Sequence, residues 1–390
     1  MPTDVENAIS ILGDLIAFNT VSDRSNLEIV EYIESYLNDH GIASYRVADA
    51  NLKKAGLFAT IGDPSIPGYV LSGHTDVVPT DGQDWTKEPF NMTEEDGRLY
   101  GRGTSDMKGY LACMLAAVPA LVKAEPALPI HLAFSHDEEI GCLGAPILID
   151  EMIKHMAKPI AAFVGEPSQM MIKDCHKGSC GMTTTITGLA CHSSRPDLGA
   201  SAIGAAASVV EHIHAIGAEL ASNPRPELNA YEVPYSTTTC GVIHGGTARN
   251  LIAGDCVIQW DIREAWPGDK AMIQERVETF IQTKVLPDLR SAFANATIDT
   301  EVAYDVPSLS AKEGSELETL VKRFAAQNQT SSASFATEAG IFDNAGIPAV
   351  VCGPGRDSEA HIEDEWVAKD QIAACMAFME RLTDAVKPNT

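Results

Sequence analysis

Residues 69–76 read YVLSGHTD, a short apolar run that passes directly into polar side chains. Such a run, with a β-branched residue and a glycine near its end, is typical of a buried strand. Working outward, residues 130–135 (IHLAFS) and 161–164 (AAFV) show the same pattern, whereas residues 108–122 have helical apolar spacing. Strands that alternate with helices predict an α/β layered fold.

The same alternation covers both ends of the chain. We expect helices over residues 5–18, 27–40, 108–122, 315–327 and 369–386, and strands over residues 57–61, 69–73, 130–135, 161–164 and 349–352.

The pattern changes near Gly178, where a different order of elements begins. Strands are expected over residues 182–189, 236–243, 256–262 and 297–303, and helices over residues 199–221 and 270–285. This β-α-β-β-α-β order is typical of a small ferredoxin-like α+β domain. We therefore predict a discontinuous α/β domain, residues 1–178 and 307–390, with an α+β domain inserted at residues 179–306.

Composition excludes several classes of protein. The chain has 390 residues, 45% of them hydrophobic, with 28 Lys+Arg against 54 Asp+Glu and a net charge of −26. The hydrophobic fraction excludes a disordered chain, and the length favours two domains. The acidity argues against nucleic acid and against an anionic membrane surface as partners.

The nine cysteines and the N-terminal segment indicate the compartment. The cysteines are scattered, odd in number and free of any Cys-x-x-Cys pair, so neither a disulfide framework nor a thiolate zinc site is expected. Residues 1–6 (MPTDVE) are acidic rather than basic, unlike a secretory signal, and no apolar run approaches the length of a membrane span. We expect a cytoplasmic protein with reduced thiols.

Polar residues gather where predicted strands end. In open α/β sheets the carboxyl ends of the strands border the ligand crevice. Five separate segments deliver carboxylates or imidazoles there, namely His74 with Asp76, Asp106, Glu138 with Glu139, Glu166, and His361.

Such a cluster has a chemical use. Carboxylates packed together repel one another unless a cation lies between them. Two histidines and three carboxylates suit a pair of zinc ions, which polarise a carbonyl and lower the pKa of a bridging water. Taken singly, each residue also fits a hydrogen-bonded loop or a solvated acidic face, so spacing alone leaves both interpretations open.

Five ordered motifs carry a resemblance to a known family. They are residues 73–79 (GHTDVVP), 100–109 (YGRGTSDMKG), 137–141 (DEEIG), 165–168 (GEPS) and 360–361 (AH). Together they resemble the zinc-dependent aminoacylase and deacetylase family of metallopeptidases over nearly the whole chain. The resemblance implies a zinc-peptidase-like catalytic domain and an inserted domain that serves as lid and dimerisation surface, so that a homodimer is expected.

The resemblance also implies a role for each residue of the cluster. His74 and Glu166 would bind one zinc, Glu139 and His361 the other, and Asp106 would bridge the two. Cobalt or manganese could replace zinc.

Two further carboxylates would act without binding metal. Asp76 would orient His74 by accepting the other ring N–H. Glu138 would be the general base that takes a proton from water and delivers it to the leaving amine.

The inserted domain resembles the family as well. Residues 188–196 (GLACHSSRP) contain its Gly-x-x-x-His-Ser pattern, so His192 would stabilise an oxyanion across a dimer interface. Arg263 and Asn250 would hold the substrate carboxylate. The chain departs from the pattern at Ala253, where many relatives have proline, and at Glu264; the first makes the role of Asn250 less secure. Arg263 also fits a plain ion pair at a strand end.

Substrate choice depends on weaker signals. Residues 336–340 (ATEAG) look like the corresponding segment of the deacetylases that act on acetylornithine, and Glu338 would face the ornithine ammonium group. We expect hydrolysis of N2-acetyl-L-ornithine to L-ornithine and acetate, a step of arginine biosynthesis. The alternatives are succinyl-diaminopimelate desuccinylase, aminoacylase or dipeptidase activity, or binding of metal and ligand without turnover.

Overall fold

The computed structural model describes residues 4–310 and 314–388, and the chain divides into two compact units. The first comprises Met1–Cys175, Leu309–Ser331 and Thr337–Thr390, and the second comprises His176–Ser308 and Ser332–Ala336. The expected insertion covered residues 179–306. The structure extends it by a few residues at each end and adds a short segment that returns to it later in the chain.

The first unit is built on an eight-stranded sheet with the order β1-β2-β6-β3-β7-β16-β8-β15. Strands β6, β3, β7 and β16 run parallel to their neighbours in that order, and β1, β2 and β8 pair antiparallel. The strands are β1 (Ser44–Ala48), β2 (Ala55–Ile61), β3 (Tyr69–His74), β6 (Ile130–Ser135), β7 (Ala161–Pro167), β8 (Ile172–His176), β15 (Thr330–Ala333) and β16 (Ala349–Gly353).

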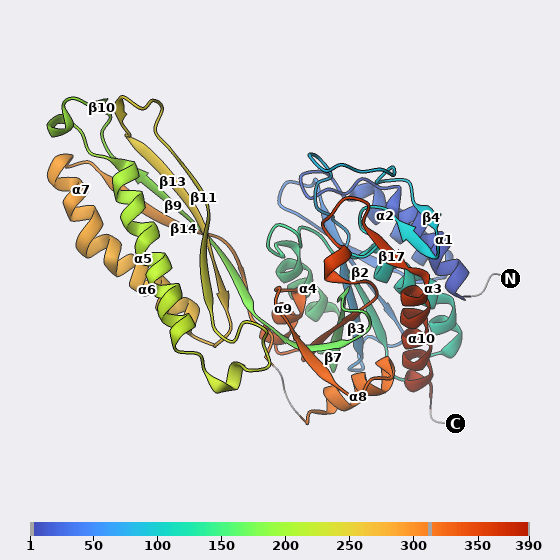
Figure 1. The fold of residues 1–390 in the computed structure, drawn as a ribbon. Coiled ribbons are helices and arrows are strands. Elements are labelled where there is room, and N and C mark those ends of the chain that lie inside the picture. The colour runs from blue at the N-terminus through green and yellow to red at the C-terminus, as the bar shows by residue number, and fades with distance from the viewer. Residues whose placement is uncertain (1–3, 311–313, 389–390) are drawn as a thin grey trace. The chain divides into compact units, whose positions relative to one another are not determined.

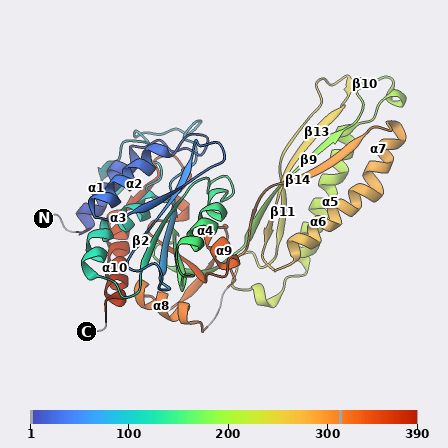
Figure 2. The ribbon, with the colours of Figure 1, turned by 180° about the vertical axis from the view of Figure 1, so that it is seen from behind.

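Helices cover both faces of this sheet (Figures 1 and 2). On one face α3 packs on the central strands and is itself covered by α1 and α10, with α2 and α8 beside them; α4 and α9 cover the other. Every residue of α3 from Lys108 to Val118 is buried, which explains its nearly uniform apolar sequence. The helices are α1 (Asp4–Ile16), α2 (Leu27–Asp39), α3 (Lys108–Ala124), α4 (Gly144–His155), α8 (Glu316–Ala325), α9 (Glu338–Asn344) and α10 (Lys369–Val386).

A small sheet with the order β17-β5-β4 also belongs to the first unit. Its strands are β4 (Thr93–Glu95), β5 (Arg98–Tyr100) and β17 (Trp366–Ala368). Because Trp366 pairs with Tyr100, the loop that follows β16 returns to lie beside the loop that precedes α3.

The second unit has an antiparallel sheet with the order β11-β13-β9-β14. One long helix, α5, and the α6–α7 segment pack on it, so the expected β-α-β-β-α-β order is present. Its elements are β9 (Gly178–Thr187), β10 (Cys191–His192), α5 (Ala202–Ser222), β11 (Thr237–Gly245), β12 (Leu251–Ile252), β13 (Asp255–Glu264), α6 (Asp269–Phe280), α7 (Leu286–Ala292) and β14 (Thr297–Val306).

Two expectations about helices differ from the structure. The helix expected over residues 270–285 is α6 followed by a π-helical turn at Ile281–Val285, after which α7 continues. Helices α4 and α9 were not predicted. Within the part of the chain that the structure describes, no helix is both long enough and apolar enough to cross a membrane.

Candidate metal centre

The carboxyl ends of the parallel strands gather the expected side chains in the first unit. His74 is the last residue of β3, and Glu166 lies near the end of β7, which pairs on to Pro167 instead of stopping at Val164. Glu138 and Glu139 follow β6, after Asp137, whose backbone has a left-handed φ of 58°. Asp tolerates that conformation better than most residues, and it turns the chain sharply at the strand end.

Asp106 lies between two histidines from distant parts of the chain. Its Oδ1 is 3.0 Å from Nε2 of His74, and its Oδ2 is 3.2 Å from Nε2 of His361. Nε2 of His361 is also 3.1 Å from Oε2 of Glu139, and Nε2 of His74 is 3.6 Å from Oε1 of Glu166. One carboxylate therefore faces two imidazoles, each of which has a further carboxylate beside it.

Two groups of ligand atoms are close enough to hold a metal ion. Ligand atoms of His74, Asp106 and Glu139 lie within 4.8 Å of one another, and so do those of His74, Glu138 and Glu166. The neighbouring glutamates 138 and 139 thus join different groups.

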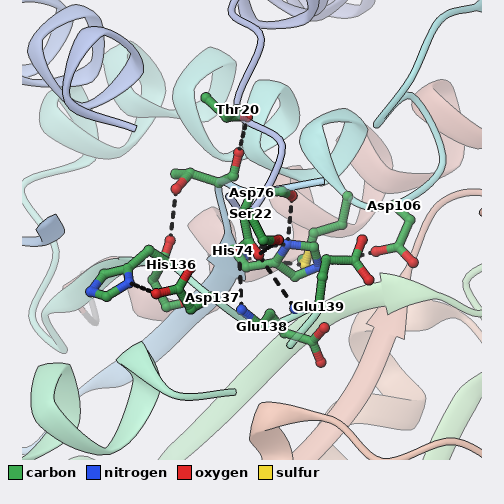
Figure 3. A network of polar contacts seen from close by, with 12 residues as sticks. Thr20, Ser22, His74, Asp76, Asp106, His136, Asp137, Glu138 and Glu139 are labelled. Atoms are coloured by element: carbon green, nitrogen blue, oxygen red, sulfur yellow. Dashed lines mark hydrogen bonds and ion pairs between the residues drawn. The ribbon is translucent and has the colours of Figure 1, made fainter. Parts of the chain in front are cut away.

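Asp76 organises the surroundings of this cluster (Figure 3). Its carboxylate accepts hydrogen bonds from the Ser22 hydroxyl at 2.6 Å and from the backbone N–H groups of Glu138 and Glu139 at 3.2 and 3.3 Å. Nδ1 of His74 is 2.9 Å from the backbone carbonyl oxygen of Asp76, whereas the carboxylate is 3.5 Å away. The backbone carbonyl of Asp76 is thus the nearer partner of the ring, and the carboxylate mainly holds the loop of the two glutamates.

The buried carboxyl groups of the cluster would be stabilised by a bound cation. Burial, with the charges of nearby carboxylates, raises the pKa of Glu138 to about 8 and that of Glu139 to about 7, and raises the pKa of Glu166 well above its usual value. Oε1 of Glu139 and Oε1 of Glu166 are buried and have no hydrogen-bond partner among the described residues. Buried, unpartnered carboxylate oxygens beside imidazoles are the ligands that zinc and similar divalent ions accept, so these residues fit a metal site.

Glu338 occupies an unexpected place. It begins α9, is only 1% exposed, and accepts hydrogen bonds from the hydroxyl groups of Ser72, at 3.2 Å, and Ser135. Both of its carboxylate oxygens are therefore engaged within the protein. The expectation that Glu338 meets a substrate ammonium group remains a prediction, and its burial and its partners argue against it.

The predicted oxyanion residue His192 and two of the predicted substrate residues, Asn250 and Arg263, lie in the second unit. His192, in β10, is exposed, with Nδ1 2.8 Å from the Ser194 hydroxyl, and the neighbouring Ser193 N–H donates to the carbonyl of Asn250. Arg263 instead pairs with Ser179 in the sheet, and its Nε donates to Asp261 at 2.7 Å.

The two residues expected at the substrate carboxylate lie far apart within one chain. Asn250 lies next to His192, beyond the end of the sheet at which β13 begins with Asp255, and Arg263 lies near the other end of that strand. Arg263 lies eight residue rises along the strand from Asp255, or about 26 Å at the usual rise. One chain therefore cannot offer both Asn250 and Arg263 to the same carboxylate.

Sequence reasoning missed Ser22, which bonds Asp76 from 54 positions away. A serine in a loop carries no spacing signal, so nothing in the pattern could have identified it.

Comparisons with known proteins agree with this geometry. Residues 70–385 match the model of peptidase family M20/M25/M40. The sequence is 31% identical over 380 residues to acetylornithine deacetylase of Myxococcus xanthus, and the aligned region covers 95% of each chain. Two solved structures share the fold: human carnosine dipeptidase 1 (TM-score 0.72, 16% identity, 97% of each chain) and a dinuclear metal binding peptidase of the M20 family from Bacillus subtilis (TM-score 0.65, 15% identity, 98% of each chain).

Proposed function

Because the chain belongs to peptidase family M20/M25/M40 and is thus a metal-dependent hydrolase, we propose that it hydrolyses N2-acetyl-L-ornithine to L-ornithine and acetate. The observation that supports acetylornithine as the substrate is the 31% identity to the Myxococcus xanthus deacetylase across 95% of both chains. In the reaction the amide C–N bond breaks, a C–O bond forms from water, and the amine leaves with a proton.

Five residues would hold the metal. His74 and Glu166 would bind one ion, Glu139 and His361 the other, and Asp106 would face both. Two zinc ions, or cobalt or manganese in their place, would supply Lewis acidity toward the amide carbonyl and toward water. The arrangement of Asp106 between the two imidazoles is what favours two ions over one.

Glu138 would act as the general base. Its backbone N–H donates to Asp76, and a carboxylate oxygen of Glu138 lies within 4.8 Å of ligand atoms of His74 and Glu166. A buried carboxyl group whose pKa is raised toward neutrality can both accept a proton from water and pass it to the leaving nitrogen. His192 would donate a hydrogen bond to the developing oxyanion, reaching the site of a partner chain in a homodimer.

The net charge of −26 supports a cationic substrate over a dianionic one. A succinyl-amino acid carries additional negative charge on its acyl group, whereas acetylornithine carries an ammonium group on its side chain.

A substrate panel with the metal-loaded protein tests the proposal. The panel comprises acetylornithine, succinyl-diaminopimelate, several acetyl-amino acids, and dipeptides, because human carnosine dipeptidase 1 shares the fold. We expect the highest kcat/KM for acetylornithine. A higher kcat/KM for the succinyl compound or for a dipeptide would overturn the proposal that acetylornithine is the substrate. If none of the compounds is hydrolysed, the proposal that the chain is an enzyme is overturned.

A further inference from the structure

A buried ion pair lies next to the candidate metal centre. Nη1 of Arg102 donates to Oε2 of Glu365 at 2.6 Å, and neither residue is exposed to solvent. A buried pair of this kind is weak evidence for stability, since two apolar side chains of similar size can serve the fold as well. Its other contacts therefore indicate what it does.

The second oxygen of Glu365 reaches the residue that faces both histidines. Oε1 accepts the backbone N–H of Ser105 at 2.9 Å and that of Asp106 at 3.0 Å. The backbone of Asp106 is thus fixed by a carboxylate that is itself anchored by a guanidinium. Hydrogen bonds to a charged acceptor are among the stronger ones in proteins.

The same guanidinium also connects to the loop of His361. Nη2 of Arg102 donates to Oε1 of Gln83 at 2.5 Å, and Nε2 of Gln83 donates to the backbone carbonyl of His361 at 2.8 Å. The Trp85 indole N–H completes the arrangement by donating to the same Gln83 oxygen at 2.9 Å.

We propose that Glu365 is a positioning residue which, through Arg102 and Gln83, holds Asp106 and His361 at the separation that two metal ions require. The two ligands come from loops more than 250 positions apart in the sequence, and this network joins both loops. His361 itself has a left-handed φ of 63°, a costly conformation that its surroundings must maintain.

Metal affinity is sensitive to such support. Ligand distances must fall within a few tenths of an ångström, and loss of a residue that orients a ligand costs about 10- to 100-fold in metal affinity. The proposal rests on the proposed function only in requiring that the centre binds metal, and not on the identity of the substrate.

The test compares two variants with a matched control. Glu365→Gln removes the charge that Arg102 anchors, and Gln83→Met removes the bond to the carbonyl of His361 at a less buried position. Asp269→Asn is the control, because Asp269 is also a buried carboxylate that accepts from an arginine, Arg225, at 3.0 Å, but it lies in the second unit.

Cobalt is the probe, measured by calorimetric titration and by the visible absorption of the bound ion, with thermal unfolding of each metal-free protein recorded in parallel. We expect Glu365→Gln to bind cobalt about 10- to 100-fold more weakly with an altered spectrum, and Gln83→Met to weaken one of two binding steps. Asp269→Asn is expected to unfold at a lower temperature with unchanged cobalt affinity and spectrum.

Cobalt affinities and spectra equal to those of the parent chain in both variants would overturn the proposal, as would an equal loss in Asp269→Asn. If Glu365→Gln does not fold, Gln83→Met alone decides the question by the same criteria. Absence of cobalt binding by the parent chain would instead overturn the proposed function, so the two failures are distinguishable.

Discussion

Asp106 directs one carboxylate oxygen at Nε2 of His74 and the other at Nε2 of His361, at 3.0 and 3.2 Å. A carboxylate can do this because each of its two oxygens is an acceptor, and the backbone N–H of Asp106 is held by Glu365. Each of these two imidazoles also has a further carboxylate beside it, Glu166 near His74 and Glu139 near His361.

This relationship predicts the effect of Asp106→Asn. An amide offers one oxygen and an N–H donor instead of two anionic oxygens, so it cannot face both imidazoles as an acceptor. We expect metal content to fall below two ions per chain and turnover to fall by more than about 100-fold, since loss of a ligand should exceed the loss of an orienting residue. Elemental analysis after dialysis checks the first expectation, and a variant that retains two tightly bound ions would contradict it.

Glu138→Gln separates two roles for one residue. As general base Glu138 is needed only for proton transfer, so we expect the variant to keep its metal while turnover falls by about 10²- to 10⁴-fold. Its closeness to His74 and Glu166 also permits a role as ligand, in which case metal would be lost as well. Metal content and kcat measured on the same preparation decide between them, with the exposed Glu275→Gln as control.

His131 gives a prediction about acid stability that is independent of the metal centre. It lies buried in β6 with Nδ1 2.9 Å from the Thr60 hydroxyl, and burial lowers its pKa from 6.5 to about 4. At pH 7 it is mostly neutral in both the folded and the unfolded chain, so its ionisation changes the free energy of unfolding little there. As pH falls from 6.5 toward 4 only the unfolded chain gains the proton, so stability is lost, by about 3 kcal/mol over this range.

Replacing His131 by Gln should therefore make unfolding of the metal-free chain less steeply dependent on pH between 6.5 and 4. Urea unfolding midpoints of both proteins across that range provide the measurement. Parallel pH profiles would show that His131 does not contribute to acid lability, whatever the stability of the variant at pH 7.

The family and the α/β architecture were predictable because they depend on repeated local signals. Buried strands followed by polar residues mark the carboxyl edge of a sheet, and both the match to the peptidase family and the observed sheet confirm that interpretation. Helix α9 has only seven residues and was missed because so short a segment shows no clear period. Helix α4 was also missed: it opens with Gly-Ala-Pro and has a small apolar face.

The sequence predicted the site residues that belong to motifs. It did not predict the residues that support them through hydrogen bonds. Ser22, Gln83 and Glu365 support Asp76, His361 and Asp106 by single hydrogen bonds from distant segments. No periodicity or spacing encodes such contacts, because they exist only once the loops meet. The separation of Asn250 from Arg263 was hidden for the same reason, since it depends on strand register.

That separation leads to a test of action between chains. If one site takes Arg263 from its own chain and His192 with Asn250 from a partner, His192→Ala and Glu138→Gln chains are each inactive alone but complement one another. Mixing them under conditions of subunit exchange should form hybrid dimers with one intact site, and so restore up to about a quarter of the parent activity at equal mixing, because half of the dimers are hybrids. Differently tagged chains that copurify prove exchange, and copurification without restored hydrolysis would show that His192 does not act on the partner chain.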